Sequence, residues 1–340
     1  MIAAHVQRRR TLLAAMATMT AGVSGWPRAA FANASASAGT SGFPERAVRL
    51  VVPYSVGVGP DVVARSVAQR LARVWGQPVW VDNKPGASGI VAFSDVRRTA
   101  PDGHTLFLAD TATLAVNPLL HASLPYDPVR DLLPLTLLFR ATFLLWVGGG
   151  PRWRSVSQLL DAARRAPGRV SYGSLGHGHA SHVAIETFAR AAGVHMLHVP
   201  FKEAAALFTA VANGDVDMTA FGINSVAGLM ASGRLRPLAV AARQRLASHL
   251  DIPTLVEAGG PAVTMHPWAA LMAVAGTAPA VMATLRQDIA AALHSHEVRD
   301  PAAQAGFEIT PSTPEAVRER IQADIALYAP LVSEGRITPL

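Results

Sequence analysis

The first ordered stretch of the chain passes from a short apolar run to an apolar pattern with helical spacing. Residues 48–52 are mostly apolar and β-branched, which predicts a buried strand. From Asp61 through Val74 the apolar residues recur every three or four positions, which predicts a helix with one apolar face. The loop between them carries Gly57 and Gly59, so its backbone can approach a ligand closely.

Strand-like and helical patterns alternate along the rest of the chain. Further strands are predicted at residues 78–81, 105–109, 132–138, 144–147, 170–172, 198–200, 218–221, 238–241 and 268–274. This alternation is typical of α/β sheets with parallel strands. Weak joins near 141–142 and 261–267 suggest two such sheets, and a cleft between two domains commonly binds a small ligand.

The glycine-bearing loop admits two interpretations. In an open α/β sheet, a loop at the carboxyl end of a strand commonly binds a ligand, and the N-terminus of the following helix suits an anion. The dinucleotide fingerprint is incomplete, because Val62 stands where the third glycine would be. The loop can also serve only to turn the chain, with Asp61 capping the helix.

Composition and charge limit the class of protein. The 340 residues suffice for two domains, and a chain that is half apolar and 16% charged is globular. Cysteine is absent, which excludes disulfides, thiolate chemistry and a cysteine-linked lipid anchor. No basic run with interleaved aromatic residues is present, so we expect no nucleic-acid partner. The net charge of +7 becomes 7 − 4 = +3 without the four arginines of residues 1–32, which is compatible with attracting small anions.

Residues 1–32 have the pattern of an export signal. Three arginines at 8–10 precede an uncharged, mildly apolar stretch that is too short to span a membrane. We predict cleavage near Ala32, a flexible leader at 33–42 and a periplasmic protein. Arg9-Arg10 followed by apolar residues also resembles a twin-arginine signal, with an ordinary secretory signal as the alternative.

Short motifs in a fixed order give the mature chain a resemblance to a known family. They include VRLVVPY at 48–54, GQPV at 76–79, NKPGA at 83–87, PDGHTL at 101–106, LPYDP at 124–128, YGS at 172–174 and HVPFK at 198–202. From Phe43 to near its end, the chain resembles the substrate-binding proteins of tripartite tricarboxylate transporters, the Bug-type family.

The resemblance implies an α/β periplasmic-binding-protein fold of type 2, in which crossover strands join two α/β domains around a ligand cleft. Domain 1 is expected at 43–143 plus 266–340, and domain 2 at 144–265. The implied function is periplasmic capture of a small organic carboxylate, without catalysis or a cofactor. The protein would act as a monomer and deliver its ligand to membrane permease subunits of a tripartite tricarboxylate-type transporter. Presentation of the ligand to a signalling partner is an alternative role.

We predict that loops at strand ends contact the ligand through hydroxyls, backbone N–H groups and glycines that permit close approach. The predicted contacts are Tyr54, Ser55, Gly57, Asp61, Thr111, Thr113, Ser174, Gly176, His177, Gly178, His179 and Lys202. The resembled family commonly has other residues at the positions of Val58, His177 and His179, which affects the choice of ligand. If His177 or His179 faces the cleft, anion binding should strengthen as pH falls from roughly 8 to 6.

Two other kinds of chemistry compete with this interpretation. A cluster of residue types that suit zinc is formed by His177, His179, His182 and Glu186, but the first two stand in a glycine loop, so we predict no metal. Ser174 follows a strand, as the nucleophile of a serine hydrolase does. The elbow pattern needs a glycine two residues earlier, where Tyr172 stands, so we predict no enzyme.

Overall fold

The computed structural model describes residues 42–340. The predicted signal segment, and the predicted leader up to residue 41, lie outside the described residues. Among the helices of the described part, none is both long and apolar enough to cross a membrane.

The first sheet has six strands in the order β11-β4-β10-β3-β1-β2. Its strands are β1 (Val48–Val52), β2 (Val79–Asn83), β3 (Thr105–Asp110), β4 (Leu132–Ala141), β10 (Trp268–Val274) and β11 (Phe307–Ile309). β1 pairs in parallel with β2 and β3, whereas β10 runs antiparallel to β3 and β4. Because β1 and β3 are parallel neighbours, the residues that follow them meet at one edge of the sheet.

The second sheet has five strands in the order β7-β6-β8-β5-β9. These are β5 (Leu144–Gly148), β6 (Ser171–Ser174), β7 (Leu197–Pro200), β8 (Met218–Phe221) and β9 (Leu235–Val240). β6 pairs in parallel with β7 and β8, and β5 runs antiparallel to β8 and β9.

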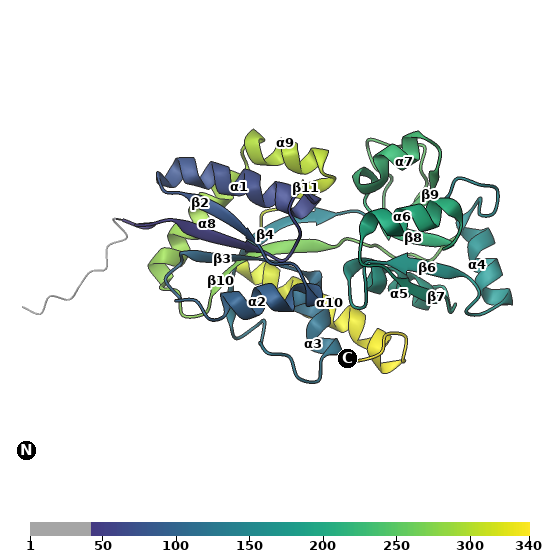
Figure 1. Ribbon diagram of the computed structural model, residues 1–340, viewed down its shortest axis with the longest axis horizontal. Coiled ribbons are helices and arrows are strands. Elements are labelled where there is room, and N and C mark those ends of the chain that lie inside the picture. Colours follow the sequence, from purple (N-terminus) through teal and green to yellow (C-terminus); the bar gives the residue numbers. More distant parts are fainter. Residues whose placement is uncertain (1–41) are drawn as a thin grey trace, which may run out of the picture. The chain divides into compact units, whose positions relative to one another are not determined.

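Helices connect the strands and flank both sheets (Figure 1). The α-helices are α1 (Gly59–Trp75), α2 (Ile90–Val96), α3 (Asn117–Leu120), α4 (Val156–Arg165), α5 (Ala180–Ala191), α6 (Ala204–Asn213), α7 (Ala227–Ala231), α8 (Pro279–Leu293), α9 (His296–Gln304) and α10 (Pro314–Ser333). Short helical turns are η1 (Ala87–Gly89), η2 (Ala112–Val116) and η3 (Ile223–Val226).

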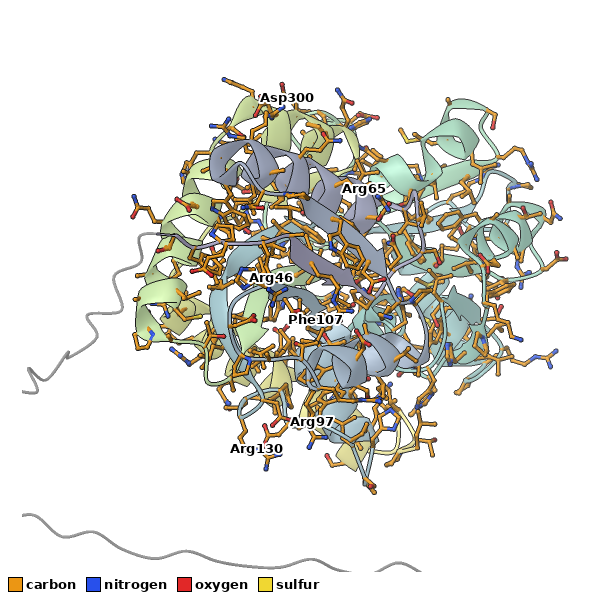
Figure 2. All side chains as sticks on the ribbon, turned by 60° about the vertical axis from the view of Figure 1, so that its left-hand side comes forward. Arg46, Arg65, Arg97, Phe107, Arg130 and Asp300 are labelled. Carbon is orange, nitrogen blue, oxygen red and sulfur yellow. The ribbon has the colours of Figure 1, made fainter. Side chains whose placement is uncertain are left out.

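The apolar faces of the helices form the core on both sides of the first sheet. On one side, α1 packs its apolar face, including Val63, together with α8 and α9. On the other side, Phe93 of α2 and Ile321 of α10 pack in a separate cluster. Phe107 of β3 lies inside this layer, whereas Arg130 projects at the periphery (Figure 2). Burial of these faces is the main term that fixes the helices against the strands.

The second sheet is covered in the same way. Leu159 of α4 and Phe188 of α5 belong to one apolar cluster. Leu207 and Val211 of α6 belong to another, together with Trp146 of β5. The helical members of both clusters recur at helical spacing, as the sequence predicts, and strand residues complete the clusters.

The alternation of strands and helices is confirmed, and β1 to β3 and β6 to β8 pair in parallel as expected. The other pairs are antiparallel, so both sheets are mixed. β4 and β5 belong to different sheets, and only Thr142 and Phe143 separate them. When the chain crosses from one sheet to the other, the first strand that it forms there begins at one edge of the sheet. The neighbouring strands end at this same edge. This applies to β5 and to β10, and each therefore runs antiparallel to its neighbours.

Two crossing segments of the chain lie against each other between the sheets. The N–H of Ala141 donates to the carbonyl of Pro267, and the N–H of Phe143 donates to that of Met265. The domain limits that we predict at 43–143 plus 266–340 and at 144–265 stay a prediction.

Candidate functional site

A cavity of about 490 Å³ lies between the strand ends of the two sheets. From the first sheet, the wall includes Tyr54 and residues 57–60 of the loop after β1. From the second sheet, it includes Leu175, His179 and Phe221. The volume is in the range of small-molecule binding pockets.

Three helices begin at the wall of this cavity. Gly59, Ala180 and Ala204 are the first residues of α1, α5 and α6, and each lines the cavity. The first N–H groups of a helix have no partner within it, and the helix carries a partial positive charge at this end. The wall is therefore suited to an anionic group of a ligand.

Aromatic side chains form much of the remaining wall. They are Phe139, Phe143, Phe208, Phe221, Trp268 and Phe307, apart from Tyr54. Phe143 and Phe208 each lie close to Phe221, with ring centroids 5.6 and 5.0 Å apart. Such a wall is suited to an apolar ligand body, because apolar and aromatic contacts supply most of the area in a small-molecule site.

Asp110 is the one carboxylate among the described residues that line the cavity. The Tyr54 phenol donates to one of its oxygens at 2.5 Å. The other oxygen accepts from the N–H and the hydroxyl of Thr113, at 2.8 and 2.9 Å. Burial, followed by the charge and hydrogen bond of Asp110, raises the pKa of Tyr54 well above its usual value. The Tyr54 phenol therefore stays protonated and keeps Asp110 in place.

His179 presents a neutral ring to the cavity. The N–H of Ser181 donates to Nδ1 of His179 at 3.1 Å, and this bond caps α5. Because Nδ1 is an acceptor, the proton of the neutral ring is on Nε2, which is a hydrogen-bond donor. Burial lowers the pKa of His179 to about 4, although the charge of Asp110 acts to raise it. His179 therefore gains its second proton at a pH below the range of 8 to 6 over which the sequence predicts a change in binding.

Asp61 is buried beneath the loop rather than at the cavity wall. It accepts hydrogen bonds from the N–H of Gly57 at 2.8 Å, from Asn83 at 2.8 Å and from Arg65 at 2.9 Å. Burial acts to raise the pKa of Asp61, but these bonds outweigh it and the pKa is lowered. Asp61 is thus an ionised carboxylate that fixes the loop.

Four of the twelve predicted contacts line the cavity: Tyr54, Gly57, Thr111 and His179. The other eight do not: Ser55, Asp61, Thr113, Ser174, Gly176, His177, Gly178 and Lys202. Among them, Thr113 holds Asp110 and Lys202 is exposed. Contact between these eight residues and a ligand stays a prediction.

Ser174 and His198 form a hydrogen-bonded pair behind the loop. The hydroxyl of Ser174 lies 2.7 Å from Nε2 of His198 and donates to the carbonyl of Gly176. A serine nucleophile must reach its substrate, but Ser174 is fully buried and does not line the cavity. The pair instead fixes the loop between β6 and α5.

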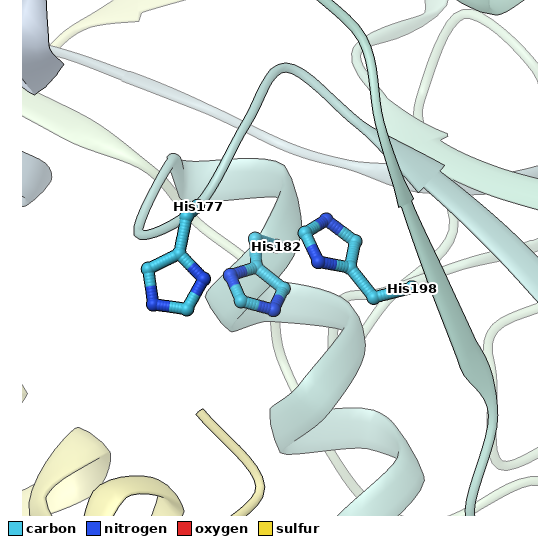
Figure 3. Close-up of side chains that lie close together, drawn as sticks. All are labelled: His177, His182 and His198. Carbon is cyan, nitrogen blue, oxygen red and sulfur yellow. The ribbon is translucent and has the colours of Figure 1, made fainter. Parts of the chain in front are cut away.

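Three histidines lie side by side near the start of α5 (Figure 3). One nitrogen of each of His177, His182 and His198 lies within 4.8 Å of the others. The cluster differs from the group considered from the sequence, because β7 contributes His198. Glu186 accepts a hydrogen bond from the phenol of Tyr172 at 2.6 Å instead.

The three imidazole rings are not oriented to bind one metal ion, because their nitrogen lone pairs do not point to a common position. The rings of His182 and His198 stack with centroids 3.9 Å apart and planes 10° from parallel. A metal lies in the plane of each imidazole that binds it, so parallel stacked rings do not share one ion. Burial lowers the pKa of His182 to about 2 and that of His198 to about 4. These two stacked rings are therefore neutral at pH 7. Neutral imidazole is the form that binds a metal, so the stacked geometry alone is the reason that we propose no metal at the cluster.

The sequence reasoning missed Asp110 and most of the aromatic wall. Asp110 had a detectable signal, because it is an acidic residue directly at the end of a predicted strand. The aromatic residues had none, since they stand on separate elements from Phe139 to Phe307 and meet only in the folded chain.

Two mixed α/β sheets, crossing segments between them and a cavity lined by helix N-termini define a solute-binding receptor of the periplasmic-binding-protein class. The family described as "Tripartite tricarboxylate transporter family receptor" matches residues 63–335. The chain belongs to this family, which confirms the resemblance and the predicted fold. Because the family consists of transporter receptors, the chain is a receptor and not an enzyme.

Individual relatives agree with this assignment. The Protein BugT of Bordetella pertussis is 30% identical over 86% of this chain and 90% of its own length. The structure "R. palustris Rpa4515 with adipate" is 31% identical, with a TM-score of 0.79 over 88% of this chain and 100% of that one. MatC from Rhodopseudomonas palustris with bound malate is 28% identical, with a TM-score of 0.75 over 84% of this chain and 99% of that one.

Proposed function

We propose that the chain is exported to the periplasm, where it acts as a monomer, binds a small organic carboxylate and delivers it to the permease subunits of a tripartite tricarboxylate-type transporter. The receptor family supports the transport role. The relatives that hold adipate and malate support a carboxylate ligand. The convergence of three helix N-termini on one cavity is the observation that carries the proposal.

A carboxylate in this cavity would be bound by neutral donors. The described residues that line the cavity include neither lysine nor arginine. The available donors are N–H groups at the helix N-termini and Nε2–H of His179. Each helix end contributes about 0.3–1 kcal/mol to the binding of an anion at an accessible site.

We divide the twelve predicted contacts into three groups. Tyr54, Gly57, Thr111 and His179 would touch the ligand, because they line the cavity. Asp61, Thr113 and Ser174 would hold the contacting loops through the hydrogen bonds described above. For the remaining five, Ser55, Gly176, His177, Gly178 and Lys202, contact with the ligand stays a prediction.

Val58 offers a direct test of the anion site. It is the N-cap of α1, has an extended backbone and makes no side-chain cap bond. Its side chain lines the cavity and is 41% exposed. Asp at this position would cap the helix and bring a negative charge to the helix N-terminus, whereas Asn would cap it without the charge.

The experiment begins with a thermal-shift screen of mono-, di- and tricarboxylates and aromatic acids, followed by calorimetry of the best ligand. We expect Val58→Asp to raise its Kd at least tenfold, or about 1.4 kcal/mol. Val58→Asn should change the Kd less than threefold, and both variants should be at least as stable as the parent. Stabilisation by none of the carboxylates, or equal Kd values in the two variants, would contradict the proposal.

A further inference from the structure

Asp110 gives the cavity a negative charge that the protein itself does not neutralise. The three hydrogen bonds to its carboxylate come from a phenol, a hydroxyl and a backbone N–H, all of them neutral groups. None of the ion pairs within residues 42–340 includes Asp110. No lysine or arginine of the described part lines the cavity.

The nearby histidine does not supply the missing charge. Nδ1 of His179 accepts from the N–H of Ser181, which leaves the ring with one proton on Nε2. Its burial favours the uncharged ring at pH 7. The wall thus combines helix N-termini that attract an anion with a carboxylate that repels one and attracts a cation.

A dicarboxylate without an ammonium group would find a favourable partner for only one of its charges, at the helix N-termini. Its second carboxylate would enter a cavity that contains Asp110, no lining cation and a large aromatic surface. In such surroundings, like charges repel more strongly than in water. An ammonium group on the ligand would instead pair with Asp110 and could also contact an aromatic face.

We infer that the ligand is an aminocarboxylate, with its carboxylate at the helix N-termini, its ammonium group at Asp110 and an apolar body against the aromatic wall. This inference rests on the proposed function for the carboxylate half of the ligand. It adds the ammonium group, for which Asp110 is the specificity-determining residue.

The test is a calorimetric comparison of five probes that share a six-carbon chain. These are hexanoate, adipate, 2-aminohexanoate, 6-aminohexanoate and hexylamine. They differ only in the presence and placement of the two charged groups, so differences in apolar contact are small. Using both amino acids covers a short and a long separation between the ammonium and the carboxylate.

We expect at least one of the two amino acids to bind the wild-type protein at least tenfold more tightly than both hexanoate and adipate. In Asp110→Asn, which keeps the shape of the side chain, this preference should fall below threefold. Asp161→Asn is the matched control, because it removes the same charge from an exposed position on α4 that is paired with Arg164. It should keep the full preference.

The outcomes separate this inference from the proposed function. If adipate or hexanoate binds as tightly as the amino acids, the inference of an ammonium group on the ligand is wrong. The proposed function as a carboxylate receptor then still stands. If hexylamine binds as tightly as the best amino acid, the pairing of an ammonium group with Asp110 is supported. The proposal that the helix N-termini bind a carboxylate of the ligand is then wrong. An unchanged preference in a folded Asp110→Asn would remove Asp110 from recognition. The wild-type ranking decides the inference even if that variant does not fold.

Discussion

At the scale of single residues, Asp61 determines the shape of the loop that forms one wall of the cavity. Its carboxylate joins the N–H of Gly57 to Asn83, and Asn83 also donates to the carbonyl of Tyr54. The same tyrosine donates to Asp110. A residue outside the cavity therefore positions two residues of its wall.

Asp61→Asn should destabilise the protein by about 1–3 kcal/mol at pH 7, because a buried carboxylate with three donors loses part of its pairing. The folded-state pKa of Asp61 is lowered, so its contribution is present above the unfolded pKa of about 3.9 and is lost as pH falls through the folded value. Urea unfolding of both proteins at pH 7 and near pH 3 measures this difference.

The difference between Asp61→Asn and the wild type should shrink at the acidic pH. Asp161→Asn is again the control, because Asp161 is exposed and its change should stay within about 0.5 kcal/mol. Equal unfolding free energies for wild type and Asp61→Asn at pH 7 would show that the loop does not depend on this carboxylate.

Part of the site was predictable at this scale. Residue types such as a glycine or a hydroxyl at a strand end predict a loop at the edge of a sheet, and Tyr54, Gly57 and Thr111 of such loops line the cavity. The hydrogen bond from Tyr54 to Asp110 was not predictable, because it joins residues 56 positions apart. It depends on β1 and β3 being neighbours, which no local pattern states.

At the scale of elements, local patterns identified strands and helices because burial imposes a period on each of them. Strand direction has no such signature. β5 and β10 are apolar runs like the others, and their antiparallel pairing follows from where the chain enters each sheet. The sequence therefore predicts the elements better than their pairing.

The burial of histidines at the start of α5 and on β7 also has a consequence for stability. His179, His182 and His198 have folded-state pKa values of about 4, 2 and 4, because burial disfavours their charged forms. Unfolded, they titrate near pH 6.5, so the unfolded chain binds more protons below that pH. Stability should fall from about pH 6.5 toward pH 4, by up to about 1.4 kcal/mol per pH unit for each histidine.

Urea unfolding at pH 7, 6 and 5 gives this slope. His198→Gln should reduce it by about one proton, or about 1.4 kcal/mol per pH unit. His296→Gln is the control, because His296 lies almost fully exposed on α9, away from the buried histidines. If all three proteins have the same slope, His198 is not kept neutral by the fold.

At the scale of the whole molecule, the cavity belongs to neither sheet alone. Its wall combines residues from Tyr54 to Phe307, so most of the chain must fold before it exists. This is why the sequence could place a cleft between two sheets but could not describe its aromatic surface. The family resemblance supplied the class of ligand, whereas only the folded chain brings Asp110 and the aromatic residues together.

The predicted export is also a property of the whole chain, and the predicted signal lies outside the described residues. If the twin-arginine interpretation is correct, Arg9→Lys with Arg10→Lys should keep the precursor in the cytoplasm, because that signal is read by its own translocase. Cell fractionation and immunoblotting measure the distribution. Normal export of the double variant would show that the general secretory route suffices, and would leave the proposed periplasmic location standing.

The position of Trp268 makes the protein its own optical reporter. Trp268 is the one tryptophan among the described residues that line the cavity, and its indole N–H is tied to Asp324 at 2.7 Å. Trp268 is almost fully buried but lines the cavity, so a ligand that contacts its ring should change its emission. The same titration with Trp268→Phe should be spectroscopically silent while calorimetry still detects binding. Fluorescence would thus follow the occupancy of the cavity in real time, without any label.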